Sequence, residues 1–414
     1  MTNFQANRRG ALAFLAGASA LPLVGACANA QAAEDGSSPS GSAPAPEAVG
    51  QPMPGNVELP DTPPEKPSGD SVGYAVVGLG GDALNPLMPS ISGARRSHIA
   101  ALVSGNRGKC ETVAKAYGVP ADACYSYDNF DEIASDDRID AVYIVLPSGL
   151  HAEYVERAFA AGKHVLCEKP MALSSTECER MIAASKAANR KLMIAYRCHF
   201  EPHNLKAMEL MRDKAVGDIR LIRANQQYRM GPTTPKKNWR VDRSLAGYGP
   251  LEDYGIYGLQ SALYLSGEMP ATIAARMVQP TGDSRFAEIA SSVSTLIKFP
   301  SGAMAELYTS YDTRSANRGV VYGTSGVLEM DPATGYGGHQ YTLRTDGVQQ
   351  IEAGDPSVQF AAQFDHLADA IRDGADIRTP GEMGLRDVRL MEAIFKSALT
   401  DSVIHINPDG TIRS

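Results

Sequence analysis

A short apolar run followed at once by a glycine turn constrains the fold of this chain more than any other feature. Residues 74–77 form the run, and the turn GLGGDA (78–83) follows directly. In the pattern Gly-x-Gly-x-x-Ala the first glycine permits a tight turn, and the second lets backbone N–H groups approach a pyrophosphate. The small third residue lets a helix pack on the strand. Glycine turns after strands are common, but this one opens the folded part of the chain. We therefore predict a dinucleotide site at Gly78, Leu79, Gly80, Gly81 and Ala83.

Apolar runs and helical patterns alternate over the segment that follows. Further apolar runs lie at 98–103, 140–146 (DAVYIVL), 164–167 and 191–195. Helical patterns lie between them at 109–117, 151–161 and 174–189, the last with Ser174 or Ser175 as its N-cap. Strands that alternate with helices form a parallel sheet covered on both faces. We therefore predict that residues 71–195 form an α/β Rossmann domain, whose ligands bind at the carboxyl ends of the strands.

The turn after the second apolar run decides which dinucleotide fits. An NAD site needs an acid there to bind the ribose hydroxyls. This chain instead reads SGNRGK over 104–109, with a hydroxyl, an amide and two cations but no carboxylate. Such a set suits a 2′-phosphate, which accepts charge-assisted hydrogen bonds and helix N-terminal N–H groups. A solvated basic turn is the alternative. We predict NADP as the cofactor, bound through Ser104, Gly105, Asn106 and Lys109.

Two other strand ends carry candidate site residues. The run at 164–167 leads into Glu168, Lys169 and Pro170. A lysine at the carboxyl end of a parallel strand points into the ligand crevice, although most single lysines lie on the surface. Pro170 fixes the turn and is a candidate for a cis peptide bond. The run at 140–146 leads likewise into PSGLH (147–151), so we expect Pro147 and His151 to flank the nicotinamide.

The second half of the chain is less regular. Partial alternation predicts strands at 219–228, 292–299 and 302–308, and helices are expected near Ile256, at 362–371 and at 387–400. This mixture predicts an α+β domain at 196–414 with a large, open, mostly antiparallel sheet. One face of such a sheet needs cover, so we expect a homo-oligomer, either a homodimer or a homotetramer.

Two polar clusters stand out in this half. Trp239 is the only tryptophan and precedes Arg240. Asp253 and Tyr257 are four residues apart, so on a helix they share one face. An acid can orient a neighbouring phenol, and a lysine from the other domain would lower the pKa of that phenol toward working pH. A satisfied buried tyrosine is the alternative interpretation.

The first 70 residues have the composition of a targeting signal followed by a linker. Arg8 and Arg9 precede an apolar run at 11–28, and small residues follow it. This layout predicts a twin-arginine signal peptide over 1–32, which exports a folded protein to the periplasm. A general secretory signal is one alternative, and a lipid anchor at Cys27 is another. Residues 33–70 are rich in proline and predict an extended linker or an arm along another subunit.

Composition excludes several classes of partner. Thirty-nine basic residues face 47 acidic ones, and a net charge of −8 disfavours nucleic acid. The body of the chain holds no apolar stretch long enough to span a membrane. Six scattered cysteines without a C-x-x-C pair predict neither a disulfide framework nor a metal site. His199 and His203 are spaced like a ligand pair, but Pro202 between them argues against a regular helix.

The motifs GLGGDA, SGNRGK, CEKP, YRCH, NWR and DYGIY occur together in this order. In this combination the chain, from about residue 74 to about 400, resembles the family of glucose–fructose oxidoreductase, inositol dehydrogenase and related sugar dehydrogenases (Gfo/Idh/MocA). ALVSGN, AGKHVLCEKPMA, KLMIAYRCH and DPATGY make it most similar to the glucose–fructose and aldose–aldose oxidoreductases.

The resemblance assigns roles to individual residues. Lys169 positions the sugar, Tyr257 transfers the proton, and Asp253 is the acid one turn before it. Ser104 and Lys109 bind the 2′-phosphate. The cofactor-binding set it implies also includes Glu168, Lys169, Tyr196, Arg197, Trp239 and Arg240. His199 is a candidate for the sugar site. Ser148, Tyr248, Pro250 and Glu252 depart from the family pattern.

The resemblance also implies a reaction. Hydride passes between C1 of a pyranose and C4 of the nicotinamide, Tyr257 takes the proton of the anomeric hydroxyl, and a lactone results. Because a free NADP pool is not expected in the periplasm, we predict a tightly held cofactor that a second sugar re-oxidises. A sugar dehydrogenase with freely exchanging NADP is the second hypothesis. A sugar or cofactor sensor on the same fold is the third.

Overall fold

The computed structural model of the protein describes residue 51 and residues 53–413. The predicted signal peptide at 1–32, the candidate lipid anchor at Cys27 and the first part of the proline-rich segment lie outside the described residues. Those predictions therefore stay predictions.

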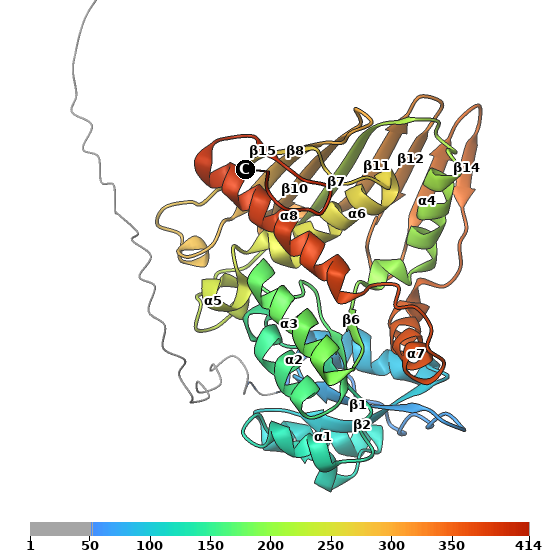
Figure 1. Ribbon diagram of the computed structural model, residues 1–414, viewed down its shortest axis with the longest axis vertical. Helices are drawn as coiled ribbons and strands as arrows, with labels where there is room; N and C mark the ends of the chain where they lie inside the picture. The colour runs from blue at the N-terminus through green and yellow to red at the C-terminus, as the bar shows by residue number, and fades with distance from the viewer. Residues whose placement is uncertain (1–50, 52, 414) are drawn as a thin grey trace, which may run out of the picture. The chain divides into compact units, whose positions relative to one another are not determined.

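A six-stranded parallel sheet forms the first half of the described chain (Figure 1). Its order, β3-β2-β1-β4-β5-β6, is that of a dinucleotide-binding fold. The five predicted strands are confirmed, and β3 is an additional strand of two residues. The strands are β1 Val72–Val77, β2 Ser97–Val103, β3 Cys124–Tyr125, β4 Ala141–Ile144, β5 His164–Cys167 and β6 Leu192–Ile194.

The three predicted helices of this half are also present: α1 Arg107–Tyr117, α2 His151–Ala160 and α3 Ser175–Ala188. Ser174 is the N-cap of α3, because its hydroxyl accepts the backbone N–H of Glu177 while the Glu177 side chain accepts that of Ser174. Asn106 caps α1 by accepting the backbone N–H of Lys109. Local capping therefore fixes where both helices begin.

The segment after the glycine turn is not a regular α-helix. It is a π-helical turn, Ala83–Leu87, followed by a 3₁₀ helix, Met88–Gly93. Pro86 and Pro89 lie within these turns. Because proline has no N–H and its ring clashes with the preceding turn, an α-helical ladder cannot run through this segment.

A nine-stranded sheet forms the second half, in the order β14-β13-β12-β11-β7-β10-β9-β8-β15. Every neighbouring pair is antiparallel except β7 and β10. The predicted α/β plus α+β architecture is thus confirmed. The strands are β7 Ile219–Arg229, β8 Thr272–Val278, β9 Ser292–Lys298, β10 Met304–Ser310, β11 Asp312–Gly323, β12 Val327–Asp331, β13 Gln340–Arg344, β14 Val348–Ile351 and β15 Ile404–His405.

Helices cover one face of this sheet. Figure 1 shows α6 and α8 lying across it, and both contact its strands. Leu296 on β9, Met304 on β10 and Tyr322 on β11 are exposed apolar side chains of this sheet. The homo-oligomer expected from such a sheet stays a prediction. The helices are α4 Pro202–Arg212, α5 Arg243–Ala246, α6 Ile256–Ser266, α7 Gln359–Arg372 and α8 Gly381–Thr400.

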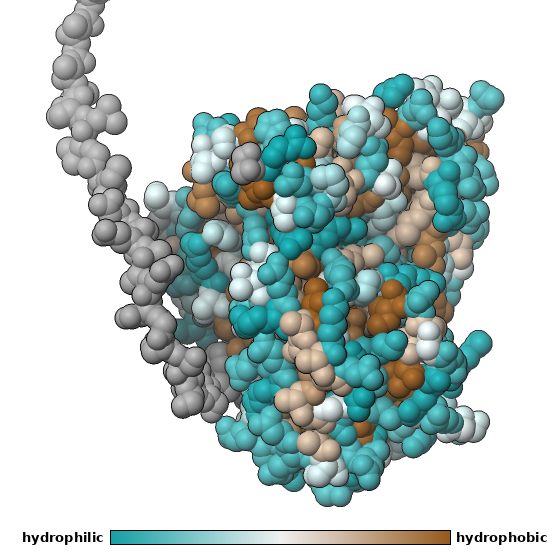
Figure 2. Space-filling view, in the orientation of Figure 1, coloured by the Kyte–Doolittle hydropathy of each residue, from teal (hydrophilic) through white to brown (hydrophobic). Residues whose placement is uncertain are grey.

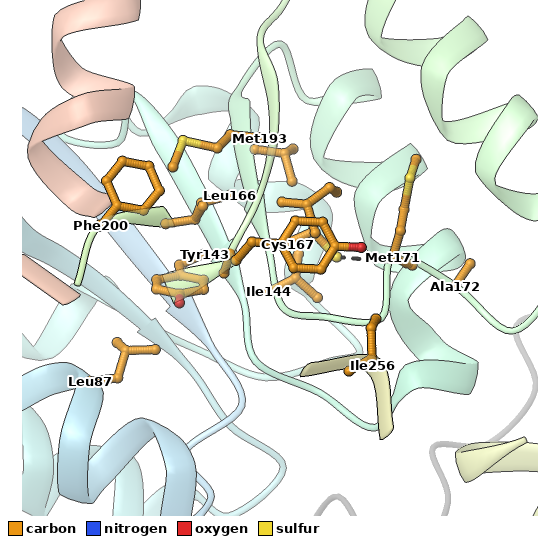
Figure 3. Packing of buried hydrophobic residues seen from close by; sticks show 14 of the residues in the cluster. Leu87, Tyr143, Ile144, Leu166, Cys167, Met171, Ala172, Met193, Phe200 and Ile256 are labelled. Carbon is orange, nitrogen blue, oxygen red and sulfur yellow. Dashed lines mark hydrogen bonds between the residues drawn. The ribbon is translucent and has the colours of Figure 1, made fainter. Parts of the chain in front are cut away.

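One hydrophobic core joins the two halves. Ile144 and Cys167 on the Rossmann strands lie near Ile256, the first residue of α6 (Figure 3). The strand end that leads to Lys169 and the helix that carries Tyr257 therefore share one packed support.

Helix α7 links the halves a second time. It follows β14 of the nine-stranded sheet in sequence but packs on the Rossmann sheet, where the Tyr74 hydroxyl donates to the Phe364 carbonyl at 2.8 Å. The rings of the two residues meet edge to face, with centroids 4.9 Å apart. A segment that follows the predicted domain boundary near residue 195 therefore packs on the domain that precedes this boundary.

The described part of the proline-rich segment lies against its own Rossmann domain. Met53, Val57 and Leu59 pack against the core, and Pro63 lies beside Gly118 at the end of α1.

Hydrophilic side chains cover most of the face seen in Figure 2. Within residues 53–413 no helix has both the length and the apolar character that a membrane span requires.

Candidate active site

A cleft of about 520 Å³ brings together the carboxyl ends of the Rossmann strands and residues of the second half. This is the edge at which a parallel sheet of this order binds its ligand. Most of the predicted site residues line the cleft: Gly78, Leu79, Gly80, Gly81, Ala83, Lys109, Pro147, Glu168, Lys169, Arg197, Trp239, Arg240, Asp253 and Tyr257.

The glycine turn has the geometry that a phosphate cradle needs. Gly78 has φ +96°, and a Cβ there would lie 2.3 Å from the carbonyl oxygen of Val145. At Gly80 and Gly81 an added Cβ would meet nothing within 4 Å. A side chain at Gly78 would therefore clash with the protein backbone, so the fold requires glycine there. Gly80 and Gly81 have no such neighbour, and their lack of side chains leaves open space in the cleft. This arrangement fits the pyrophosphate of a dinucleotide.

The turn after β2 presents a cation and no carboxylate. The Lys109 ammonium lies in the cleft and donates to the carbonyl of Leu79 at 2.9 Å. Burial lowers the pKa of Lys109. Ser104, Gly105 and Asn106 are not among the residues that line the cleft, and the Ser104 hydroxyl accepts the Asn106 N–H at 3.2 Å. Of this predicted set, only Lys109 reaches the cleft.

The loop after β5 carries the predicted lysine into the cleft. The Lys169–Pro170 peptide bond is cis. The Lys169 ammonium donates to the Asp253 carbonyl at 2.7 Å and to its carboxylate Oδ1 at 3.4 Å. Glu168 accepts the Tyr143 hydroxyl at 2.7 Å and the Lys169 N–H at 3.2 Å. Burial raises the pKa of Glu168, although Lys169 and Tyr143 oppose that shift.

Asp253 is held by cations and not by the phenol expected beside it. Its Oδ2 accepts Arg240 Nε at 3.1 Å and the Tyr311 hydroxyl at 2.8 Å. Burial alone would raise the pKa of Asp253, but Arg240, Lys169 and Tyr311 more than reverse it, so the pKa is lowered. Asp253 therefore positions Lys169 and Arg240 as a fixed anion. The prediction that it orients Tyr257 is replaced by this finding.

Arg197 is the partner of the candidate proton carrier. Its Nε donates to the Tyr257 hydroxyl at 3.1 Å. The guanidinium also donates to the carbonyls of Thr334 and Gly335 and to the Gln359 side chain. These bonds fix the guanidinium against the phenol. Arg197 thus contacts the candidate proton carrier Tyr257, in addition to the cofactor contact predicted from the YRCH motif.

The protonation state of Tyr257 differs from the expectation. Burial raises its pKa above the ordinary value, and the charge of Arg197 only partly offsets that rise. The Lys169 ammonium lies 5.0 Å from the ring centroid and makes no hydrogen bond to the phenol in the described structure. The resting side chain is therefore a neutral hydroxyl, because desolvation of the phenolate outweighs the nearby positive charge.

Three predicted residues lie behind the cleft wall. His151 is buried, with its ring nitrogens 2.9 Å and 2.8 Å from the carbonyls of Pro170 and Leu146. It therefore connects the loop after β4, which was expected to flank the nicotinamide, with the loop after β5 that carries Lys169. Tyr196 is also buried and does not line the cleft. His199 bonds Gln260 at 2.8 Å and is not on α4, which begins at Pro202.

Several lining residues escaped sequence reasoning. Tyr336 lies in the cleft, and its ring centroid is 4.5 Å from the Arg197 guanidinium. The DPATGY motif, noted only as a resemblance, supplies this ring. Glu252 is buried in the cleft wall, where burial raises its pKa to about 8. Gln51 and Pro54 of the proline-rich segment also line the cleft, so this chain's own arm reaches it.

Two family models match the halves of the chain. Residues 72–196 match the model of an oxidoreductase family with an NAD-binding Rossmann fold, and residues 204–329 match the GFO/IDH/MocA C-terminal domain. The D-xylose 1-dehydrogenase (NADP(+)) 2 of Haloferax volcanii is 29% identical over 337 residues, which cover 81% of this chain and 99% of that protein.

A second relative and a solved structure agree with these matches. The NADP(+) D-xylose 1-dehydrogenase of Haloarcula marismortui is 28% identical over 346 residues, 81% of this chain and 93% of that protein. The crystal structure of aldose-aldose oxidoreductase from Caulobacter crescentus, complexed with glycerol, is 41% identical with a TM-score of 0.78. That match covers 81% of this chain and 100% of the crystallised one.

Proposed function

Because this chain belongs to the Gfo/Idh/MocA family of oxidoreductases, we propose that it oxidises an aldose at C1 to its lactone and reduces a second sugar, with NADP as a tightly held cofactor. One observation carries the proposal. Lys169, Arg197 and Tyr257 line the same cleft as the glycine turn. The candidate proton carrier Tyr257, its partner Arg197 and the second cation Lys169 thus lie in the same cleft as the candidate pyrophosphate site.

The choice of NADP has two supports. The NADP-dependent relatives match four-fifths of this chain. The turn after β2 offers the Lys109 ammonium to the cleft and no carboxylate that would repel a 2′-phosphate.

The chain's own residues handle the proton. The nicotinamide, when bound, supplies the hydride acceptor and donor. Tyr257 removes the proton of the anomeric hydroxyl during oxidation and returns a proton to the carbonyl oxygen during reduction. The Arg197 N–H at 3.1 Å stabilises the phenolate form that oxidation requires. Lys169 makes two contacts with Asp253, which leaves its third N–H for a sugar hydroxyl.

Two-sugar turnover follows from retention of the cofactor. The similarity to an aldose-aldose oxidoreductase supports it. Gln51 and Pro54 line the cleft, so the arm lies where it would slow cofactor release. A periplasmic location is part of the proposal and rests on the arginine pair of the sequence. Export of the folded protein would carry the cofactor out already bound.

Purification of the full chain without added cofactor tests the proposal. We expect denaturation to release NADP or NADPH, identified by mass spectrometry, and a pair of aldoses to react without added nucleotide. Deletion of residues 33–56 should speed cofactor release. A preparation that is empty and depends on added NADP would support the freely exchanging dehydrogenase. Absence of turnover on any aldose, with or without NADP, would refute the enzymatic proposal.

A further inference from the structure

A second cluster of polar side chains lies outside the cleft. Glu201 precedes α4, His203 lies in its first turn, and His339 lies in the loop between β12 and β13. None of the three lines the cleft. The side chains of Glu201 and His339 are 0% exposed and that of His203 is 9% exposed. The cluster is therefore a closed polar site inside the second half of the fold.

The three side chains converge on a small volume. His203 Nδ1 lies 2.9 Å from Glu201 Oε1, and His339 Nε2 lies 3.7 Å from Glu201 Oε2. One ligand atom from each residue lies within 4.8 Å of the other two. Ligand atoms that share a tetrahedral zinc ion at about 2.0–2.1 Å are about 3.4 Å apart. The separations of 2.9 Å and 3.7 Å lie on either side of this value. The widest pair of ligand atoms, which are within 4.8 Å of each other, would move together by at most about 1.4 Å to bind an ion.

His339 makes this arrangement unusual. Both of its ring nitrogens are buried and have no hydrogen-bond partner among the described residues. A buried imidazole normally satisfies at least one nitrogen, because an unpaired polar group away from water costs free energy. Its Nε2 faces a carboxylate at 3.7 Å, too far for a hydrogen bond. A cation between the two atoms would satisfy both.

Glu201 is already positioned for such a role. Its carboxylate caps α4 by accepting the backbone N–H groups of His203 and Asn204 at 2.9 Å and 2.7 Å. It also accepts the Asn204 side-chain amide at 2.6 Å. A carboxylate fixed beside two imidazoles is a typical ligand set for zinc.

We propose that Glu201, His203 and His339 bind a divalent transition-metal ion, with zinc as the ion that fits best. On binding, His203 Nδ1 releases the proton that it shares with Glu201 and becomes a ligand, and the proton passes to solvent. The two imidazoles stack with planes 9° apart, so one ring must rotate to direct both lone pairs at one ion. The inference does not depend on the proposed function.

The ion would connect two segments that also support the cleft. The loop that carries His339 contains Thr334 and Gly335, whose carbonyls accept Arg197. Arg197 lies in the 3₁₀ turn Arg197–His199, close before α4 in sequence. Zinc would therefore stabilise the wall behind Tyr257 as a structural ion, without contact with substrate.

Metal analysis of the full chain tests this site. The chain is stripped with a chelator, dialysed against zinc, desalted and analysed by elemental mass spectrometry. We expect about one zinc per chain, a higher unfolding temperature with zinc, and a visible absorption band when cobalt replaces zinc. His339→Gln and His203→Gln should each weaken zinc affinity more than about tenfold. His405→Gln, which alters an exposed histidine, is the control and should keep it.

The outcomes separate cleanly. The wild-type measurement needs no variant, so failure of one variant to fold does not leave the question open. Circular dichroism of the stripped variants shows whether each is folded. Less than a tenth of a zinc per wild-type chain, or equal affinity in folded His339→Gln, would overturn the proposal. Loss of zinc from His405→Gln as well would show binding elsewhere and would also overturn it.

Discussion

Replacement of Tyr257 by phenylalanine removes the one atom that the proposed proton transfer needs. The ring stays, and with it the contacts to Arg197 and Lys169, whose charged groups lie 4.7 Å and 5.0 Å from its centroid. Only the hydroxyl and its hydrogen bond from Arg197 are lost. The substitution therefore separates proton transfer from packing more cleanly than an alanine would.

The expected magnitudes differ for catalysis and stability. Loss of general acid–base catalysis costs about 10²–10⁴-fold in kcat, equal to about 2.7–5.4 kcal/mol of barrier. Loss of one hydrogen bond from a charged donor costs up to about 3 kcal/mol of folding free energy. The loss of folding free energy in Tyr257→Phe should lie well below that limit, because Arg197 keeps its hydrogen bonds to Thr334, Gly335 and Gln359.

Steady-state kinetics of sugar oxidation across pH is the assay. Because burial raises the pKa of Tyr257, wild-type kcat should rise with pH as the phenolate becomes available. Tyr257→Phe should lose both the rate and this dependence. Tyr117→Phe is the control, since its buried hydroxyl has no hydrogen-bond partner among the described residues. A loss of less than about tenfold, or an unchanged pH profile, would refute the assignment of Tyr257.

Four further substitutions separate the parts of the cleft. Gly78→Ala should destabilise the fold, because its Cβ would lie 2.3 Å from the Val145 carbonyl, whereas Gly80→Ala should leave the unfolding temperature unchanged and weaken NADP binding. Lys109→Met should weaken binding of NADP more than of NAD in fluorescence titrations, because only NADP carries the 2′-phosphate. Glu252 has a folded pKa raised to about 8, so its contribution to stability is complete at acidic pH and is lost as pH rises toward 8. The difference between the unfolding temperatures at pH 5 and pH 8.5 should therefore shrink in Glu252→Gln; an equal difference in both proteins would contradict the assignment.

The Rossmann half could be predicted because its strands are buried on both faces and appear as unbroken apolar runs. All six residues of β1 are buried, for example. The second sheet is harder to predict because its strands are buried on one face or on neither. Strand β14 has the sequence VQQI, and its first three residues are exposed. No apolar pattern therefore marks this strand. The order in which β7 pairs with both β10 and β11 depends on contacts distant in sequence and on no local signal.

The same physics explains which site residues could be predicted. Lys169 and the glycine turn follow strands of one parallel sheet, and parallel topology brings their carboxyl ends to one edge. Arg197 meets Tyr257 only because the loop before β13 returns to hold the guanidinium with two carbonyls. No spacing in the sequence encodes that return. The spacing of Asp253 and Tyr257 suggested a carboxylate–phenol pair, but Asp253 bonds Arg240, Tyr311 and Lys169. A carboxylate beside the phenol would raise its pKa further, whereas the guanidinium stabilises the phenolate that the proposed oxidation needs. The pairing that sequence reasoning missed is therefore the one that suits the chemistry.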